Sequence, residues 1–218
     1  MNNNIVPQLL PIEKSNETVR NTILTNVVKM ITERKLLNKN NIEANIQKIL
    51  SVHPDDMLYK IQLDTKIDNH NTMMIKLLPQ NITSTSKISP IMEFFNQHKN
   101  IPKIVIVEKI SYKTIYNIKN DAMYPNTEIF MEKELMINII EHTSQPEFYL
   151  LSDEEKQMVL KEYQAKQREI PEMKVTDPVA KYYNAKIFQM FRILRPSETS
   201  GLVPYYRLVV RGDINDYV

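Results

Sequence analysis

The stretch from residue 171 to residue 210 constrains the fold most strongly, because its cap and turn residues predict a short helix followed by a β-hairpin. Asp177 is a good N-cap residue, and Pro178 suits the first helical position, where its missing N–H is not needed. The helix is expected to run from Val179 to Tyr183. Because both the cap and the turns are specified by residue type, the pattern favours a small α+β unit.

The hairpin is predicted from alternation and turn chemistry. Residues 190–195 alternate with the period of a strand, and Pro196 is expected to end it, because proline donates no N–H to a ladder. Residues 197–201 combine hydroxyl side chains with a glycine that tolerates positive φ, which is typical of a turn. Residues 205–210 are rich in strand-forming types and predict the return strand.

Three blocks in this stretch resemble a known family: Asp177-Pro-Val-Ala-Lys-Tyr182, Arg195-Pro-Ser-Glu-Thr-Ser-Gly201 and Tyr206-Arg-Leu-Val209. They are similar to the signature of the fifth subunit of eukaryotic-type DNA-directed RNA polymerases. The C-terminal half is also similar to the archaeal polymerase counterpart of this subunit, which consists of the C-terminal unit alone. Residues 135–142 resemble the junction between the two domains of the family.

The resemblance implies two domains and no active site. Residues 1–142 would form a jaw-like, three-layer α/β domain of the restriction-endonuclease type without catalysis, and residues 143–218 a small α+β assembly domain. The chain would then be a non-catalytic polymerase subunit without a cofactor. It would dock on the largest subunit, contact neighbouring small subunits and place the jaw near downstream DNA.

Two surfaces are implied as contact sites. The possible DNA contact is the strand-to-helix tip with Lys109, Ser111 and Lys113, whose simpler interpretation is an ordinary exposed loop. The arginines of the hairpin offer a charged docking surface, or else they form surface ion pairs worth about 0–1 kcal/mol each. The residues implied in docking are Asp177, Pro178, Arg192, Arg195, Pro196, Ser197, Glu198, Thr199, Gly201, Tyr206 and Arg207.

The sequence departs from the family pattern in three places. Glycine is usual in the family where Asn184 and Phe188 stand. Asparagine tolerates left-handed φ, whereas phenylalanine is not a turn residue, so the turn at 185–189 is the feature most in question. The chain also continues past Val209 to Val218, beyond the usual end of the family.

Composition excludes several classes of function. The chain has only two glycines, Gly201 and Gly212, so it has no glycine-rich phosphate loop. It has no cysteine, which excludes disulfides and thiolate zinc sites, and its four histidines are isolated from one another. No apolar run is long enough for a membrane span. A net charge of +2 predicts at best weak DNA binding.

The N-terminal half predicts strands that alternate with helices, which indicates an α/β domain with a mixed sheet. The run Ile104–Val107 is continuously apolar, as in a strand that is buried on both faces. Helices are expected at residues 17–36, 41–50, 87–98, 111–120 and 133–139, and strands at 57–64, 73–78, 103–108 and 127–130, with a turn at 68–72.

The C-terminal half follows a linker at residues 142–147 and begins with a strand at 148–151. Ser152 and Glu155 form a capping box that predicts a helix to Tyr163. We expect this half to fold alone and limited proteolysis to give a stable fragment that begins near residues 143–148.

Two other functions remain open. Asp55, Asp64 and Lys66 resemble the pattern of a metal-dependent nuclease, although a strand between the two aspartates would separate them by roughly 25–30 Å. A scaffold protein that keeps only the C-terminal module is the third interpretation.

Abundant Asn, Ile, Lys and Tyr suggest an AT-rich genome, such as that of a protist or a large DNA virus. The location would be the nucleus, or the virion and cytoplasmic replication site of a virus.

Overall fold

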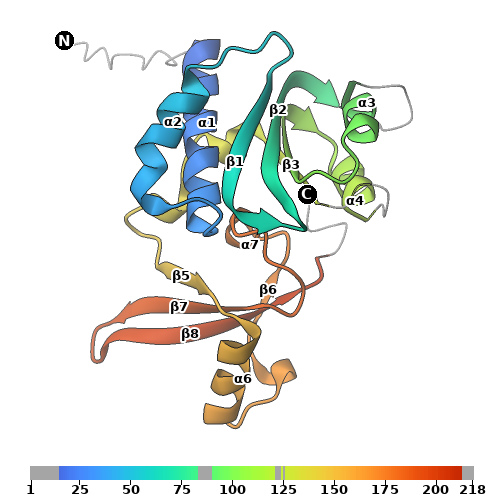
Figure 1. The fold of residues 1–218 in the computed structure, drawn as a ribbon. Helices are drawn as coiled ribbons and strands as arrows, with labels where there is room; N and C mark the ends of the chain where they lie inside the picture. Colours follow the sequence, from blue (N-terminus) through green and yellow to red (C-terminus); the bar gives the residue numbers. More distant parts are fainter. Residues whose placement is uncertain (1–14, 83–89, 121–123, 125, 213–218) are drawn as a thin grey trace, which may run out of the picture.

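The computed structural model describes residues 15–82, 90–120, 124 and 126–212, and in them the chain forms two four-stranded sheets (Figure 1). The strand orders are β1-β2-β3-β4 and β5-β7-β8-β6. The elements are α1 (Asn16–Glu33), η1 (Lys39–Asn41), α2 (Ile42–Leu50), β1 (Leu58–Ile67), β2 (His70–Ile82), α3 (Pro90–Gln97), β3 (Lys103–Ile110), α4 (Tyr112–Asn120), β4 (Thr127–Met131), α5 (Glu132–Leu135), η2 (Ile139–Glu141), β5 (Glu147–Leu150), α6 (Asp153–Glu162), η3 (Gln167–Glu169), β6 (Glu172–Lys174), α7 (Pro178–Tyr182), β7 (Met190–Ser197) and β8 (Gly201–Val210).

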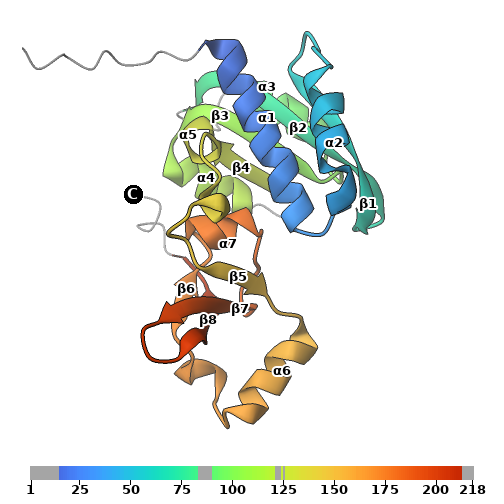
Figure 2. The same ribbon diagram turned by 90° about the vertical axis from the view of Figure 1, so that its left-hand side faces the viewer.

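The first sheet is the middle layer of three, and it is mixed, as predicted. β1 and β2 are antiparallel, whereas β2, β3 and β4 are parallel. Helices α1 and α2 pack on one face through one hydrophobic core, and α3 and α4 pack on the other face through a second core (Figures 1 and 2). None of the helices in the described residues is long and apolar enough to cross a bilayer.

Strand β3 is buried on both faces, which confirms the prediction from its apolar run. Ile104 and Ile106 face the core under α1, and Val105 and Val107 face the core under α3 and α4. All four side chains are 0% exposed. Burying each of these side chains contributes about 1.5–3 kcal/mol, so β3 is the centre of the first sheet and of the two cores on its faces.

Helix α1 ends three residues earlier than expected, because its last turn closes as a Schellman motif. Lys35 has φ 62°. The N–H of Lys35 donates to Thr32 O at 2.9 Å, and the N–H of Leu36 donates to Ile31 O at 3.2 Å. These bonds satisfy the last carbonyls of the helix and make Arg34 its C-cap.

Strands β1 and β2 are longer than expected because a two-residue turn joins them. Asp68 and Asn69 both have positive φ, 45° and 67°, which matches the twist of the flanking strands.

The helix expected at residues 133–139 ends at Leu135 instead. Asn138 interrupts it, because its side chain accepts the N–H of Ile140 and starts the separate turn η2. The first residues of the helix expected at 87–98 and the tail 213–218 lie outside the described part.

The second sheet contains the predicted hairpin, but Pro196 does not end its first strand. Pro196 pairs with Leu202, and Ser197 pairs with Gly201. Strand β5 pairs with β7 only as far as Leu194, so the outer edge of β7 is open at Pro196 and its missing N–H removes no ladder bond. The turn is therefore shorter than predicted and consists of residues 198–200.

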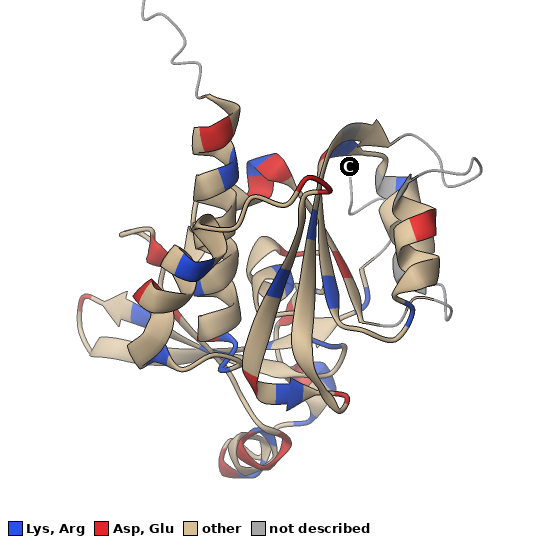
Figure 3. Cartoon of the chain, turned by 45° about the horizontal axis from the view of Figure 1, so that its top comes forward, with Lys and Arg blue, Asp and Glu red and all other residues tan. Residues whose placement is uncertain are grey.

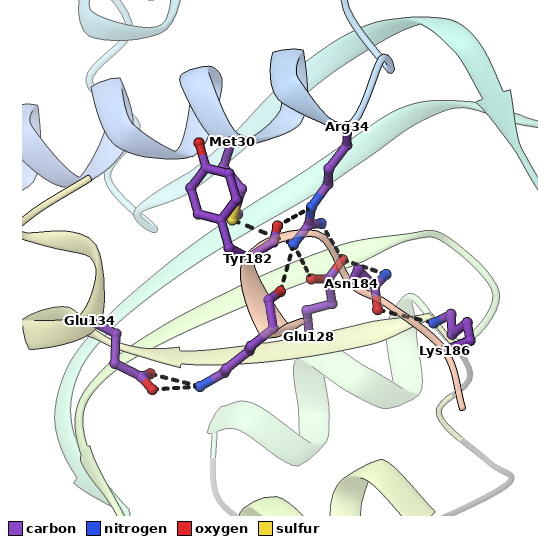
Figure 4. Close-up of polar contacts among 8 residues, drawn as sticks. Met30, Arg34, Glu128, Glu134, Tyr182, Asn184 and Lys186 are labelled. Atoms are coloured by element: carbon purple, nitrogen blue, oxygen red, sulfur yellow. Dashed lines mark hydrogen bonds and ion pairs between the residues drawn. The ribbon is translucent and has the colours of Figure 1, made fainter. Parts of the chain in front are cut away.

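A buried ion-pair network joins the two halves (Figure 4). Arg34 donates to both carboxylate oxygens of Glu128 at 2.8 Å, and their side chains are only 5% and 12% exposed. The same guanidinium donates to the carbonyls of Tyr182 at 2.7 Å and Lys181 at 3.2 Å, at the end of α7. Lys181 in turn bonds Glu134 at 2.7 Å. We call Arg34, Glu128, Lys181 and Glu134 the clamp.

Helix α7 lies between the two halves in both views (Figures 1 and 2), and the clamp fixes it there. Tyr182 belongs to the core under α1, although it lies in the C-terminal part of the chain. The division of the chain at residues 142 and 143 stays a prediction.

We predict that Arg34→Ala lowers the free energy of unfolding by about 3–5 kcal/mol, because it leaves Glu128 buried without its partner. Lys29→Ala is the matched control, since it removes the ion pair of Lys29 with Glu141, which is 2.8 Å long and far more exposed. That change should cost about 0–1 kcal/mol. Denaturant titration of both variants measures the difference, and equal losses would contradict the role of the clamp.

Candidate protein-docking surface

The signature residues Asp177 and Pro178 build α7. Asp177 Oδ1 accepts the N–H of Val179 at 2.9 Å, and Pro178 occupies the first helical position, as predicted. The helix buries Val179 and Ala180 in the core of the second sheet. Both proposed docking residues therefore have a structural function in the chain itself.

The two tyrosines at the end of α7 connect the two cores, because Tyr182 belongs to the core under α1 and Tyr183 packs against both that core and the core of the second sheet. The hydroxyl of Tyr182 is buried. Tyr183 packs edge-on against Phe191, with ring centroids 5.6 Å apart, and its hydroxyl donates to Phe148 O at 3.3 Å. Burial raises the pKa of both tyrosines, for Tyr183 to about 12. Both side chains therefore stay neutral at physiological pH and act as packing groups.

The two positions where the family usually has glycine both have positive φ: Asn184 at 49° and Phe188 at 71°. The turn at 185–189 thus keeps a glycine-like conformation with a phenylalanine in it. Two backbone bonds hold Phe188: its N–H donates to Val209 O at 2.8 Å, and its carbonyl accepts Lys156 Nζ at 2.7 Å. Lys156 is 6% exposed, so this bond also satisfies a buried ammonium.

The tip of the β7–β8 hairpin projects past the rest of the sheet (Figure 1). Residues 195–197 and 201–203 pair only with each other, because β5 stops at Leu194 and β6 reaches β8 only at residues 208–210. Gly201 has φ 72° at the end of the three-residue turn, which is a standard geometry for such loops. The proposed docking residues Ser197, Glu198 and Thr199 lie at this tip.

The structure divides the three predicted docking arginines between two faces. Residues that are directly opposite in the ladder share a face, and neighbours along a strand alternate. Arg192 is opposite Tyr206, and Arg207 is opposite Phe191, so Arg195 shares its face with Arg207 and not with Arg192. Arg207 donates to Glu172 O at 3.1 Å, which ties it to β6.

The other two arginines of the hairpin, Arg192 and Arg195, each lie over an aromatic ring. The guanidinium carbon of Arg192 is 5.4 Å from the ring centroid of Tyr149, and that of Arg195 is 5.1 Å from the centroid of Tyr205. Such pairs contribute about 0.5–1 kcal/mol at exposed sites. They also hold the long side chains in fixed positions, which reduces the entropy lost when a partner binds.

Sequence reasoning missed the apolar residues of this surface. Leu202 is 66% exposed opposite Pro196, and Tyr205 is 50% exposed on the other face. The return strand was predicted to begin at Tyr205, because Pro204 is a local signal against a strand. In the structure β8 begins at Gly201, and Pro204 is opposite Leu194 in the ladder. We define the hairpin tip as residues 195–205.

The proposed DNA contact residues come together at the carboxyl end of β3. Lys109 is in the strand, Ser111 directly precedes α4, and Lys113 is in the first turn of that helix. All three are exposed. The carbonyl of Ser111 accepts the N–H groups of Thr114 and Ile115, so Ser111 occupies the position before the first helical turn.

The nuclease pattern is not assembled. Asp55 lies in the turn before β1, whereas Asp64 and Lys66 lie in the far half of that strand. Asp64 accepts the N–H of Asn38 at 2.8 Å, which holds the segment after α1. Within the described residues no three acidic or histidine side chains gather to hold a metal ion.

Comparisons with known proteins show what the chain is related to. Residues 137–209 match the family described as RNA polymerase Rpb5, C-terminal domain. A relative from Acanthamoeba polyphaga mimivirus, DNA-directed RNA polymerase subunit 5, is 30% identical over 208 residues, 93% of this chain and 97% of the relative. RPABC1 of Caenorhabditis elegans, a subunit of RNA polymerases I, II and III, is 38% identical over 116 residues, 52% of this chain and 55% of the relative.

The chain belongs to the family of RNA polymerase subunit 5. A further relative, subunit 5B of RNA polymerases IV and V from Arabidopsis thaliana, is 23% identical over 158 residues, 72% of either chain. The expectation of a polymerase subunit that is accessory and not catalytic is confirmed by this membership.

We predict that Phe188→Gly raises the free energy of unfolding by about 1 kcal/mol, because glycine adopts positive φ without the clash of a Cβ. The Phe188 side chain is 61% exposed, so little buried area is lost. Phe188→Ala is the control: it removes the same ring but keeps the Cβ, and should give no gain. Thermal unfolding of the two variants measures the change in stability. A gain in stability for the alanine variant alone would show that the backbone of Phe188 is not strained by its positive φ.

Proposed function

We propose that this chain docks on the largest subunit of its RNA polymerase through the hairpin tip. The observation that carries the proposal is the projection of a rigid, partly apolar ribbon beyond the sheet. Leu202 and Tyr205 supply exposed apolar area, Arg195 and Glu198 supply a charged donor and acceptor, and the turn fixes their spacing. Aromatic and arginine side chains of this kind are the usual anchors of protein interfaces.

The N-terminal domain would serve as the jaw near downstream DNA. Its three layers are compatible with the restriction-endonuclease type of fold, and Lys109, Ser111 and Lys113 are exposed together at one edge. Basic and acidic residues are interspersed on the same elements (Figure 3), and the whole chain has 28 basic and 26 acidic side chains. The jaw would therefore contact DNA only weakly, and the assembled polymerase would hold it in place.

Neighbouring small subunits of the polymerase would be further partners of the chain. The relative that covers almost the whole chain is viral, whereas other relatives belong to nuclear polymerases of eukaryotes. We therefore infer a function in transcription, in a viral setting by the first relative and in the nucleus by the others.

We predict that Arg195→Ala combined with Glu198→Ala weakens incorporation into the polymerase but leaves the subunit folded. Truncating a charge that becomes buried at an interface typically costs about 2–5 kcal/mol, whereas exposed charges contribute little to folding. Lys161→Ala with Glu162→Ala is the matched control, because both residues are exposed on α6. Pull-down with the largest subunit and thermal melting separate the two effects.

If the melting temperature of the Arg195 and Glu198 variant falls steeply, the tip belongs to the domain's own core. If both its melting and its incorporation match those of the control, docking lies elsewhere. A loss of incorporation in the control variant alone would move the docking surface to α6.

We predict that the free subunit binds duplex DNA no more tightly than the non-specific range of ~10⁻⁴–10⁻⁶ M. Lys109→Ala with Lys113→Ala should then weaken the contact of assembled polymerase with downstream DNA and reduce its salt dependence by about two counterions. Crosslinking of the jaw to downstream DNA at two salt concentrations measures both effects. Sub-micromolar binding of the free subunit would overturn the assignment of a weak contact.

A further inference from the structure

An open stretch of sheet edge lies between β1 and α2. The N–H of Leu77 donates to Met57 O at 3.1 Å, which fixes the phase of the antiparallel ladder. The register then turns the backbone of Tyr59 and Ile61 toward β2 and that of Lys60 and Gln62 away from it. Strand β1 is the outer strand of its sheet, so these groups point to the edge.

The edge is closed at both ends but not between them. Beyond it, the outward N–H of Asp64 donates to Leu36 O at 3.0 Å. Before it, the outward N–H of Leu58 donates to Asp56 Oδ1 at 3.2 Å. The outward N–H and C=O groups of Lys60 and Gln62 bond nothing in the described part of the chain. Two residues with this spacing form one repeat of an antiparallel ladder.

A groove of about 280 Å³ runs along this edge. One wall is β1 from Leu58 to Gln62, and the other is α2 and the segment that follows it, with Ile49 and Val52. Val52 is 48% exposed there, so it offers apolar area to an occupant of the groove. The rim is polar and consists of Asn45, Lys48, Lys60 and Gln62.

The charge of the residues that line the groove indicates which charge an occupant should carry. It contains two lysines, both exposed, and no acidic residue. A second copy of this chain is a poor occupant, since two β1 edges that paired would bring Lys60 and Lys48 of both copies together. An extended segment with acidic side chains matches both the backbone and the charge.

We propose that the β1–α2 groove binds an extended acidic peptide segment of a partner protein as a fifth strand of the jaw sheet. The backbone of Lys60 and Gln62 supplies the ladder bonds. On the face that carries α2, Val52 and Ile49 receive an apolar side chain, and on the opposite face, to which Lys60 alternates, Lys60 receives a carboxylate. This site is separate from the hairpin tip, so it leaves the tip free for docking.

The test is an NMR titration of the ¹⁵N-labelled full chain with two capped peptides, Val-Glu-Val-Glu-Val and Val-Lys-Val-Lys-Val. The acidic peptide should shift the amides of Lys60 and Gln62 and slow their hydrogen exchange. The basic peptide should bind at least about tenfold more weakly. An acidic peptide that is N-methylated at every residue has no backbone N–H for the ladder, and its methyl groups keep it off the edge, so it should not bind.

Two variants at one position test the backbone directly. Gln62→Pro removes the outward N–H without removing a bond to β2, and should weaken binding about tenfold. Gln62→Ala removes the same side chain but keeps the N–H, and should bind like the wild type. If Gln62→Pro does not fold, the N-methylated peptide still decides the question.

Several results would overturn the proposal. They are equal binding of the acidic and basic peptides, binding of the N-methylated peptide, shifts that map outside the groove, or no shift up to about 1 mM peptide. Shifts of Lys60 and Gln62 that depend on protein concentration alone would instead identify a second copy as the occupant.

Discussion

The burial of Arg34 against Glu128 is the interaction on which the arrangement of the two halves depends. Removing both charges from water is costly, and it is repaid only when the remaining hydrogen-bonding groups are satisfied. Here the guanidinium donates to two carboxylate oxygens and two backbone carbonyls. Those carbonyls belong to the end of α7, so the geometry that satisfies the arginine also fixes where the helix lies.

Helix α7 transmits that constraint to the hairpin. It has five residues, too few to be stable alone, so its cap at Asp177 and its tertiary contacts must hold it together. Tyr182 at its end belongs to the core under α1, and Tyr183, the next residue, packs against both that core and the core of the second sheet. Because Tyr183 also packs on Phe191 of β7, the path from Arg34 to the hairpin is continuous packed structure. The orientation of the tip relative to the first sheet therefore follows from the clamp.

The features of the fold that depend on neighbouring residues could be predicted from the sequence. The apolar run of β3 and the capping box of α6 needed only neighbouring residues, and both were correct. The clamp was not predictable in this way, because Arg34 and Glu128 are 94 residues apart. The exposed face of the hairpin tip was missed for a different reason: prolines are local signals against a strand, and only an open edge of the sheet permits them.

Asn184 and Phe188, which both have positive φ, show how the same backbone conformation is stabilised in different ways. Asn184 accepts the cost of positive φ and gives its side chain a function, since Nδ2 donates to Glu128 at 3.0 Å and Oδ1 accepts Lys186 Nζ at 3.0 Å (Figure 4). It thereby extends the clamp. Phe188 offers no such side-chain bond, and its ring is exposed. Its conformation is held by its backbone, through Val209 and the buried Lys156. Because a buried ammonium requires that carbonyl, the turn keeps its shape even with a residue that disfavours it.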